Sequence, residues 1–321
     1  MKKRKRLYIL SGLVMFLCMG TIYSWSVFRG PLIKELELIS GEHIGATLAQ
    51  MPYTLFLLMY SFTMPFSGKL IKKIDPRILC ISGSLLVALG WILAGSSTSI
   101  YQIMWTYGVL GGLGVGIVYG VPIAIVTEWF PHRKGLAVGI TLMGFGISPL
   151  ISAPIANALI NKSGVFQAFK DMGFTFAVVL GLLSLLFQFP KEKIELHKIS
   201  KDEVEFTTKE MLKTKSFYAL WACFVIGTFV GLTMVGIASI YAQETVGLKR
   251  ETATILLSVF AIFNGIGRPI FGSLVDKIGT KKTIYLSYTL IAISSLLQMI
   301  KSENTVIFIV SFILFFLNLG G

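Results

Sequence analysis

The chain has 321 residues, of which 54% are hydrophobic and 14% are charged, and its formal net charge is +13. Soluble domains carry about 25% charged residues, so this composition argues against a soluble protein. Ten windows of at least 18 mainly apolar residues recur along the chain, which is the pattern of transmembrane helices. The predicted spans are 7–28, 44–67, 78–96, 101–126, 136–160, 172–189, 216–241, 252–271, 283–300 and 304–321.

The lysines and arginines are divided unevenly between the two sides of these spans. If residues 2–6 lie on one side of the membrane, the loops on that side contain 21 of the 29 basic residues and the loops on the other side contain seven. The remaining basic residue, Arg268, lies within a span. By the positive-inside rule, we expect a multi-pass protein of the cell (inner or plasma) membrane with a cytoplasmic N-terminus. The basic charge then indicates the lipid bilayer as a partner and no nucleic acid.

The first span contains two aromatic candidates, Tyr23 and Trp25. Their position near the outer end of the span is typical of the aromatic belt at the membrane interface. Cys18 lies alone in the same span, as Cys80 and Cys223 do in theirs, and the three histidines fall in loops or at span ends. No ligand cluster or nucleophile–base pair can be assembled, so we expect no metal, no cofactor and no enzyme activity.

The end of the second span has a counterpart 204 residues later. The segment 65-PFSGKLIKKIDPR-77 aligns with 269-PIFGSLVDKIGTK-281, so that Pro65 matches Pro269 and Gly68 matches Gly272. Duplicated halves related by an axis along the membrane normal are a transporter architecture. The sequence therefore predicts two pseudo-symmetric halves, each of six helices when complete.

The fourth span combines small residues with a tyrosine. Glycines recur every fourth residue at 108, 112, 116 and 120, which predicts close packing of the helix against its neighbours. Tyr119 lies 18 residues from the outer end of this span, and Arg268 lies at a similar depth in the eighth. Tyr119 could donate its hydroxyl to an anion there, or it could simply pack with its hydroxyl satisfied locally.

The polar stretch 190–215 contains six acidic residues and seven lysines, which is typical of a solvated cytoplasmic linker. It divides the chain into a six-span half, residues 1–189, and a half with four spans, residues 216–321. Since a complete second half needs six spans, we expect ten of twelve helices in this chain and regard it as a fragment that stops inside the tenth.

The eighth span carries Arg268 near its cytoplasmic end. An arginine at a helix end can reach the interface by snorkelling. Helical side chains lean toward the helix N-terminus, however, so Arg268 leans toward the bilayer centre, and its repeat partner is the apolar Met64. An intramembrane arginine costs about 2.5–3.5 kcal/mol and so needs a partner. No Asp, Glu or His lies within the predicted spans, which favours an anionic substrate. Asn264 lies one turn earlier on the same face.

Several motifs resemble a known family. The residues Gly272, Leu274, Asp276, Gly279, Lys281 and Lys282 resemble the signature of the major facilitator superfamily, whereas the first half has Lys72 at the aspartate and Asp75 at the second glycine. The runs 23–36, 114–140 and 263–279 look like the oxalate/formate antiporter family, a relative of the monocarboxylate porters. This resemblance implies the superfamily fold and a carboxylate-binding role for Arg268. It also favours a substrate-binding role for Tyr23 and Trp25 over a place in the aromatic belt.

These features predict a secondary transporter of small organic anions, such as formate, oxalate, pyruvate or lactate-like monocarboxylates. The spans lack a titratable group and Asn264 stands where proton-coupled porters carry an aspartate, so anion exchange with alternating access is favoured over proton symport. A proton-coupled monocarboxylate symporter and a non-transporting receptor on a transporter scaffold remain alternatives. We expect Arg268, Tyr119, Asn264, Tyr23 and Trp25 to bind the substrate, and we expect a monomer.

Overall fold

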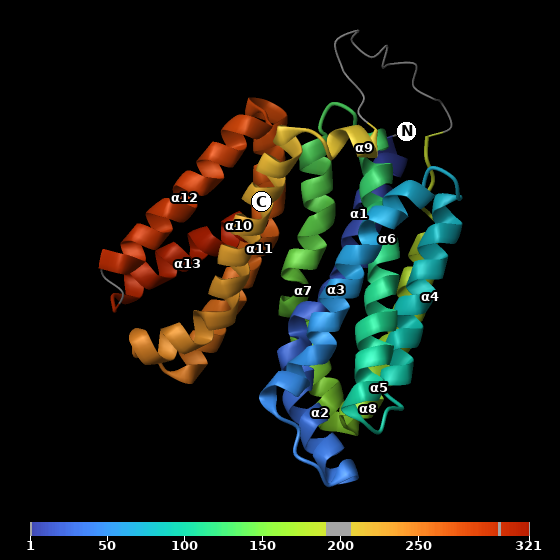
Figure 1. Cartoon of the computed structure of the whole chain (residues 1–321), viewed down its shortest axis with the longest axis vertical. Helices are drawn as coiled ribbons and strands as arrows, with labels where there is room; N and C mark the ends of the chain where they lie inside the picture. Colours follow the sequence, from blue (N-terminus) through green and yellow to red (C-terminus); the bar gives the residue numbers. More distant parts are fainter. Residues whose placement is uncertain (1, 191–206, 301–302, 321) are drawn as a thin grey trace. The chain divides into compact units, whose positions relative to one another are not determined.

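The computed structural model describes residues 2–190, 207–300 and 303–320, and these residues form helices and no strands (Figure 1). The chain forms two compact units, Met1–Phe189 and Pro190–Gly321, hereafter the N-unit and the C-unit. The boundary lies where the predicted linker begins, and most of that linker, residues 191–206, lies outside the described residues.

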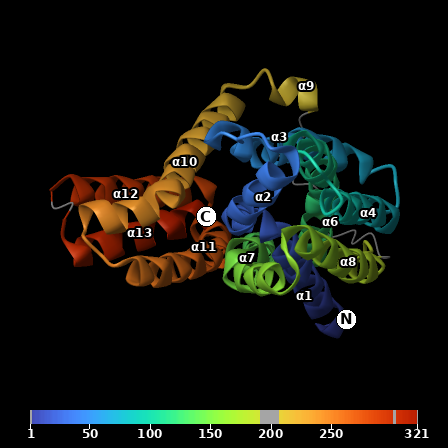
Figure 2. The same cartoon turned by 90° about the horizontal axis from the view of Figure 1, so that it is seen from below.

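The N-unit is a bundle of long helices in which neighbours in space are distant in sequence. Its elements are α1 (Lys2–Met19), the 3-10 helix η1 (Gly20–Ser24), α2 (Trp25–Ser40), α3 (Ala46–Leu70), α4 (Pro76–Ala94), α5 (Ile100–Ile103), the π-helix η2 (Met104–Gly111), α6 (Gly112–Trp129), α7 (Lys134–Ser163) and α8 (Val165–Ser184). The closest pairs are α1 with α7, α3 with α6, and α4 with α8 (Figure 2).

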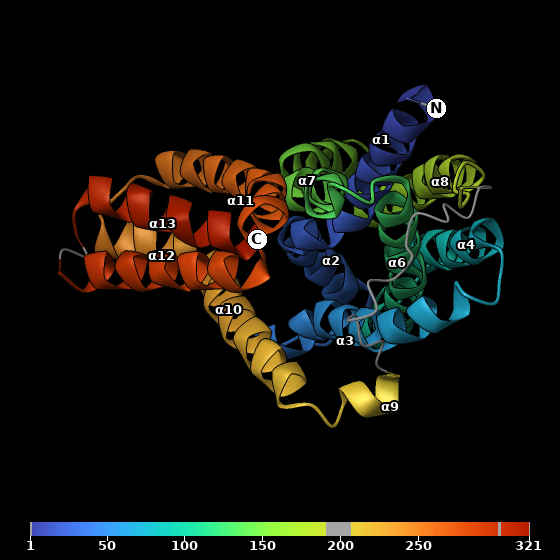
Figure 3. The same cartoon turned by 90° about the horizontal axis from the view of Figure 1, so that it is seen from above.

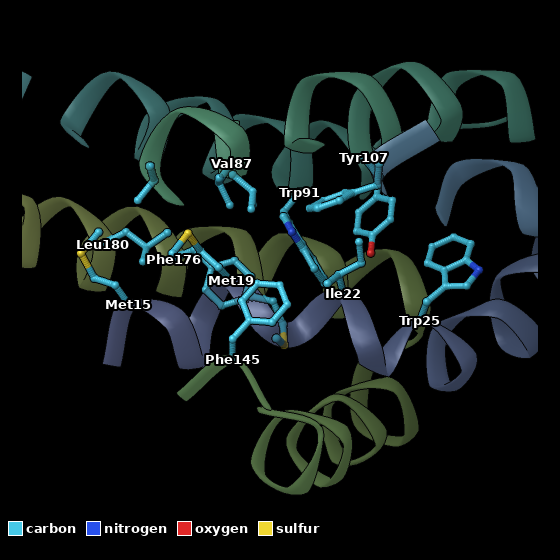
Figure 4. Packing of buried hydrophobic residues seen from close by; sticks show 14 of the residues in the cluster. Met15, Met19, Ile22, Trp25, Val87, Trp91, Tyr107, Phe145, Phe176 and Leu180 are labelled. Carbon is cyan, nitrogen blue, oxygen red and sulfur yellow. The ribbon is translucent and has the colours of Figure 1, made fainter. Parts of the chain in front are cut away.

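Large apolar side chains fill the centre of the N-unit (Figure 4). Phe28, Phe169 and Tyr107 are almost completely buried, and Trp91 contacts all three rings. Burial of an aromatic side chain contributes about 1.5–3 kcal/mol in water. Inside a bilayer the lipid tails are equally apolar, so close packing rather than exclusion of water holds these helices together.

The C-unit has a smaller core, and its last helix lies at the centre. Its elements are α9 (Thr208–Met211), α10 (Lys215–Ile240), the π-helix η3 (Tyr241–Thr245), α11 (Arg250–Ile278), α12 (Thr280–Ile300) and α13 (Thr305–Gly320). Helix α13 packs against α10, α11 and α12 (Figure 3). The core consists largely of phenylalanines from α11 and α13, namely Phe260, Phe308, Phe312, Phe315 and Phe316.

Every predicted span overlaps helical segments, although η1 interrupts span 7–28, η2 interrupts span 101–126, and span 172–189 extends past the end of α8. Among the described residues, eight helical segments are long and apolar enough to cross a membrane. The remaining two predicted spans correspond to α3 and α13. Helix α3 has 25 residues but contains two prolines and several polar side chains, and α13 is an apolar helix of 16 residues. The all-helical membrane architecture is therefore confirmed. Eight of the ten predicted spans correspond to helical segments that are both long enough and apolar enough to cross a membrane.

The apolar helical segments are longer than the predicted spans and include acidic residues that the spans exclude. Segment Lys5–Ser40 includes Glu35 and Glu37, and segment Val165–Ser184 includes Asp171, all outside the narrower predicted spans. The first segment consists of α1, η1 and α2, and both of its glutamates lie in α2. Gly164, directly before α8, lies close to Glu35, so these acids gather at the same end of the N-unit.

The sequence repeat is also a repeat of helix boundaries. Helices α3 and α11 begin at Ala46 and Arg250, and α4 and α12 begin at Pro76 and Thr280, in both cases 204 residues apart. The two copies start their second helix differently. Asp75 caps α4 by accepting a hydrogen bond of 2.8 Å from the Arg77 N–H, whereas Gly279 turns the chain with φ at +82°.

Candidate functional site

Arg268 and Asn264 lie one turn apart on α11, at the place where α11 crosses α13 most closely. A Cβ atom at Gly320 would overlap the Asn264 carbonyl and lie 3.3 Å from the Arg268 backbone nitrogen, and a Cβ at Gly267 would overlap the Leu317 carbonyl. The two glycines therefore let the backbones touch. This contact fixes the rotation of α11 and with it the direction of both polar side chains.

Asn264 is 7% exposed, and no hydrogen-bond partner satisfies its Oδ1 atom among the described residues. A buried polar atom left without a partner costs about 1–3 kcal/mol, so such atoms call for a functional explanation. Arg268 is half-buried beside it. Its guanidinium carries a permanent charge and a planar set of donors that match a carboxylate. The Arg268 guanidinium and the Asn264 Nδ2 can donate to an anion, whereas Asn264 Oδ1 can accept only from a donor such as water.

Tyr119 and Tyr23 belong to one aromatic cluster in the N-unit, here called the tyrosine cluster: Phe16, Tyr23, Tyr60, Tyr119 and Phe145. The Tyr119 ring lies 4.8 Å from Phe16, 5.2 Å from Tyr60 and 5.7 Å from Phe145, measured between centroids. Tyr23 meets Phe145 edge-on at 5.2 Å. Five helical elements thus converge on three phenol rings.

Hydrogen bonds to α7 hold Tyr23 at the break in the first helix. The Ser24 and Ser152 hydroxyls lie 2.7 Å apart, and the Ser148 hydroxyl donates to the Leu17 carbonyl at 2.6 Å. Gly20 lies against the backbone of α7. A 3-10 segment inside a long helix often marks a functional hinge, and here it carries Tyr23 toward the tyrosine cluster.

Trp25 lies in a different environment from Tyr23 and Tyr119. Its indole stacks on Tyr107 with a centroid distance of 5.0 Å (Figure 4). It is 3% exposed, which does not fit a residue of the interfacial belt, and its Nε1 donor has no partner among the described residues. The structure therefore brings together Tyr23 with Tyr119, and Asn264 with Arg268, and gives Trp25 separate contacts.

Tyr60 also belongs to the tyrosine cluster, although it is not among the predicted site residues. Tyr60 precedes Asn264 by 204 residues, the same spacing that relates Met64 to Arg268. It is half-buried and its ring contacts Tyr119. The aligned segment began at Pro65, one turn too late to include it.

The described residues contain no group of three or more His, Cys, Asp or Glu side chains able to hold a metal ion. Cys18, Cys80 and Cys223 are free thiols. Within the described helices, the chemistry around the candidate residues is that of a guanidinium, an amide, phenols and an indole, a set suited to hydrogen-bonding an anion.

Comparisons with known proteins identify the family and the fold. A model of the Major Facilitator Superfamily matches residues 10–321. The chain is 31% identical over 316 residues to the oxalate:formate antiporter of Oxalobacter formigenes, covering 98% of this chain and 73% of that protein. It is 29% identical to human monocarboxylate transporter 12, over 70% of this chain and 49% of that protein. The crystal structure of a bacterial homologue of the lysosomal transporter Spinster, inward-facing and unoccupied, has a TM-score of 0.60 at 16% identity over the whole chain and shares its fold.

Proposed function

Because the chain belongs to the major facilitator superfamily, a family of membrane transporters and not of enzymes, we propose that it carries small carboxylates across the membrane by exchanging one anion for another. The observation that supports this proposal most strongly is the pair of Arg268 and Asn264 on one face of α11. The cation lies one turn from the buried amide of Asn264, whose Nδ2 can donate to an anion, within the stretch 259–272 that is otherwise apolar or glycine.

Arg268 has the role of primary anion ligand. A carboxylate accepts two parallel hydrogen bonds from the planar fork of a guanidinium. Asn264 would supply its amide to the same anion or to a bound water. Because one ligand pair is weaker than a full cage of charges, the anion can also leave, as transport requires.

Tyr119, Tyr23 and Trp25 are the remaining proposed ligands. Tyr119 and Tyr23 offer phenol hydroxyls from the tyrosine cluster, and Trp25 offers an indole N–H that is buried without a partner among the described residues. All three are neutral donors. They can therefore stabilise a carboxylate without holding it as tightly as a second cation would.

Exchange is favoured over proton symport by the composition of the helices around Arg268. In the described C-unit, α10, α12 and α13 contain no Asp, Glu or His, and α11 carries acids only at its ends, Glu251 and Asp276. A proton-coupled carrier needs a titratable group near its substrate. Here the counter-anion takes the place of the proton in returning the carrier.

The proposal includes the arrangement in the membrane. The basic residues 2–6 favour a cytoplasmic N-terminus, and we propose residues 1–189 and 216–321 as the two halves, with 190–215 as the cytoplasmic linker. The halves rock to expose the substrate alternately to each side. We expect the protein to act as a monomer in the cell (inner or plasma) membrane.

Counterflow in proteoliposomes tests the proposal. Vesicles containing the full chain are loaded with an unlabelled carboxylate, and uptake of a labelled one is followed together with internal pH. The proposal expects labelled anion to enter only when an anion is present inside, with no matching proton entry. Uptake into empty vesicles with acidification would establish the symporter instead, and saturable binding without uptake would establish a receptor.

A further inference from the structure

The turn that joins α3 to α4 is held in place by its own backbone. The Ile71 N–H donates to the Ser67 carbonyl at 3.0 Å. The Ile74 N–H donates to the Leu70 carbonyl at 2.8 Å. Both bonds have the helical spacing of four residues, so the helical turn continues past the end of α3 to Ile74. Side chains three and four residues apart in this stretch therefore lie on the same face.

Three lysines share one face of this turn. Lys72 and Lys73 follow Lys69 by three and four residues, and all three side chains are exposed. Like charges at this spacing repel one another and destabilise the turn. None of the three forms an ion pair with an acidic side chain among the described residues. An anion from outside the chain would lower this repulsion.

Arg77, in the first turn of α4, adds a fourth cation. Its side chain is half-buried, and its Nε donor has no hydrogen-bond partner among the described residues. Asp75 is the one acidic residue of the stretch 65–78, and it caps α4 by accepting a hydrogen bond of 2.8 Å from the Arg77 backbone N–H. The Arg77 side chain therefore offers a donor that an added anion can satisfy.

The equivalent turn of the C-unit differs in charge at one position. Lys72 corresponds to Asp276, 204 residues later, whereas Lys73 corresponds to Lys277. The C-unit copy thus places a carboxylate of its own beside a lysine. The N-unit copy has a lysine at both positions, which leaves a place for a negative group from outside the chain.

Exposed apolar side chains lie next to these cations. Large apolar residues recur every four positions and are all exposed, namely Phe66, Leu70, Ile74 and Ile78. Phe66 is 59% exposed and Ile78 is 62% exposed. The Lys69 Nζ lies 6.0 Å from the centroid of the Phe66 ring. Cations beside exposed apolar groups match a phospholipid, in which the phosphate adjoins the acyl chains, whereas a free phosphate ion would use the cations alone.

We infer that residues 66–78 form a binding site for one anionic phospholipid, hereafter the lipid site. The lysines and Arg77 hold the phosphate, and the exposed apolar side chains contact an acyl chain. In a chain with a cytoplasmic N-terminus the second span ends in the cytoplasm, and the cytoplasmic leaflet carries the anionic lipids. The lipid site lies within the N-unit and does not depend on Arg268 or on the transported anion.

Native mass spectrometry of the detergent-solubilised full chain tests the lipid site. The protein is titrated with phosphatidylglycerol, which has a net negative charge, and with phosphatidylcholine, which has the same acyl chains and no net charge. We expect phosphatidylglycerol to bind more tightly by about fivefold or more. Lys72→Gln should weaken this binding about fivefold, because each cation beside an anionic headgroup contributes about that factor, and Lys72→Asp should weaken it further.

Lys162→Asp is the matched control, because Lys162 is an exposed lysine in the last turn of α7, outside the lipid site, and it should leave phosphatidylglycerol binding unchanged. Unfolding temperatures show which variants are folded, and Lys72→Gln carries the comparison if Lys72→Asp does not fold. Equal binding of the two lipids, or an equal loss of binding in the Lys72 and Lys162 variants, overturns the inference. Glycerol 3-phosphate, which has the phosphate without the chains, should not displace phosphatidylglycerol. Displacement at equal concentration would assign the cations to a soluble phosphate and would also overturn the lipid site.

Discussion

Helices α3 and α11 are equivalent helices of the repeat that share their backbone contacts but carry different side chains at the crossing. Both begin at the same point of the repeat and cross a glycine of a later helix at the same level. At that level α3 carries Tyr60 and Met64, and α11 carries Asn264 and Arg268. The backbone geometry of the crossing is thus the same in both copies, because a close crossing leaves no room for a side chain at the glycine. The side chains beside the crossing are where the copies diverged, which is the reason to look for function there.

The largest expected effect comes from giving α11 the residue of α3. Arg268→Met should weaken the apparent affinity for carboxylate by about 100-fold or more, because charge-assisted hydrogen bonds contribute about 1.5–3 kcal/mol each. The concentration dependence of counterflow measures this change. Met64→Leu is the control in the other copy and should leave affinity unchanged. A half-saturating concentration for Arg268→Met equal to that of the wild type would separate Arg268 from anion binding.

Substitution of the glycine at each crossing should destabilise the protein to a similar extent in the two copies. Gly116→Val and Gly320→Val each force side-chain atoms into the backbone of the facing helix, and we expect each to destabilise the protein by about 1–3 kcal/mol. Thermal unfolding of the purified protein measures this effect. Gly181→Ala on α8 is the control, because a Cβ there meets nothing within 4 Å. Destabilisation by only one of the two valines would mean that the crossings are not equivalent.

Asn264 is expected to lower the stability of the protein while it supports anion binding. Asn264→Leu removes the unsatisfied Oδ1 from a buried position, so we expect the protein to become more stable by about 1 kcal/mol while its anion affinity falls. Asn318→Leu is the contrasting variant on α13. Asn318 accepts a hydrogen bond from Ser287 at 2.8 Å and donates one to the Leu314 carbonyl at 2.7 Å, so its loss should destabilise the protein. Parallel unfolding and counterflow measurements separate the two effects, and a destabilised Asn264→Leu would show that Asn264 is structural.

The smallest expected effect on stability comes from the N-terminal cap of α4, the helix that follows α3. Asp75→Ala removes the cap of α4 and should lower stability by about 1 kcal/mol, with no change in anion affinity. Thermal unfolding and counterflow together measure both quantities. Altered affinity in this variant would indicate that the loop between α3 and α4 takes part in transport as well as in folding.

Much of the architecture was predictable because hydrophobic spans are long and membrane helices must satisfy their own backbone. The match of Met64 to Arg268 also followed from the sequence. The ends of the helices did not follow from the sequence, because α2 and α8 extend past the predicted spans and include Glu35 and Asp171. Composition locates the apolar part of such a helix and not its last turn.

The break at η1 and the placement of Trp25 depended on tertiary contacts. No proline or unusual glycine run announces the 3-10 segment, and the serines that bind it lie about 130 residues later on α7. Trp25 and Tyr23 are two residues apart in one motif, yet one stacks on Tyr107 and the other joins the tyrosine cluster. Which ring faces which neighbour follows from helix packing, which a single sequence does not reveal.

Equilibrium binding of a labelled carboxylate to the purified full chain tests the central claim, that Arg268 binds the transported anion, most directly. Binding is measured for the wild type, Arg268→Lys and Arg268→Gln, each shown by its unfolding temperature to be folded. The account predicts saturable binding in the wild type, weaker binding in Arg268→Lys, which keeps the charge but loses the planar fork, and none in Arg268→Gln. Wild-type affinity in Arg268→Gln would contradict it.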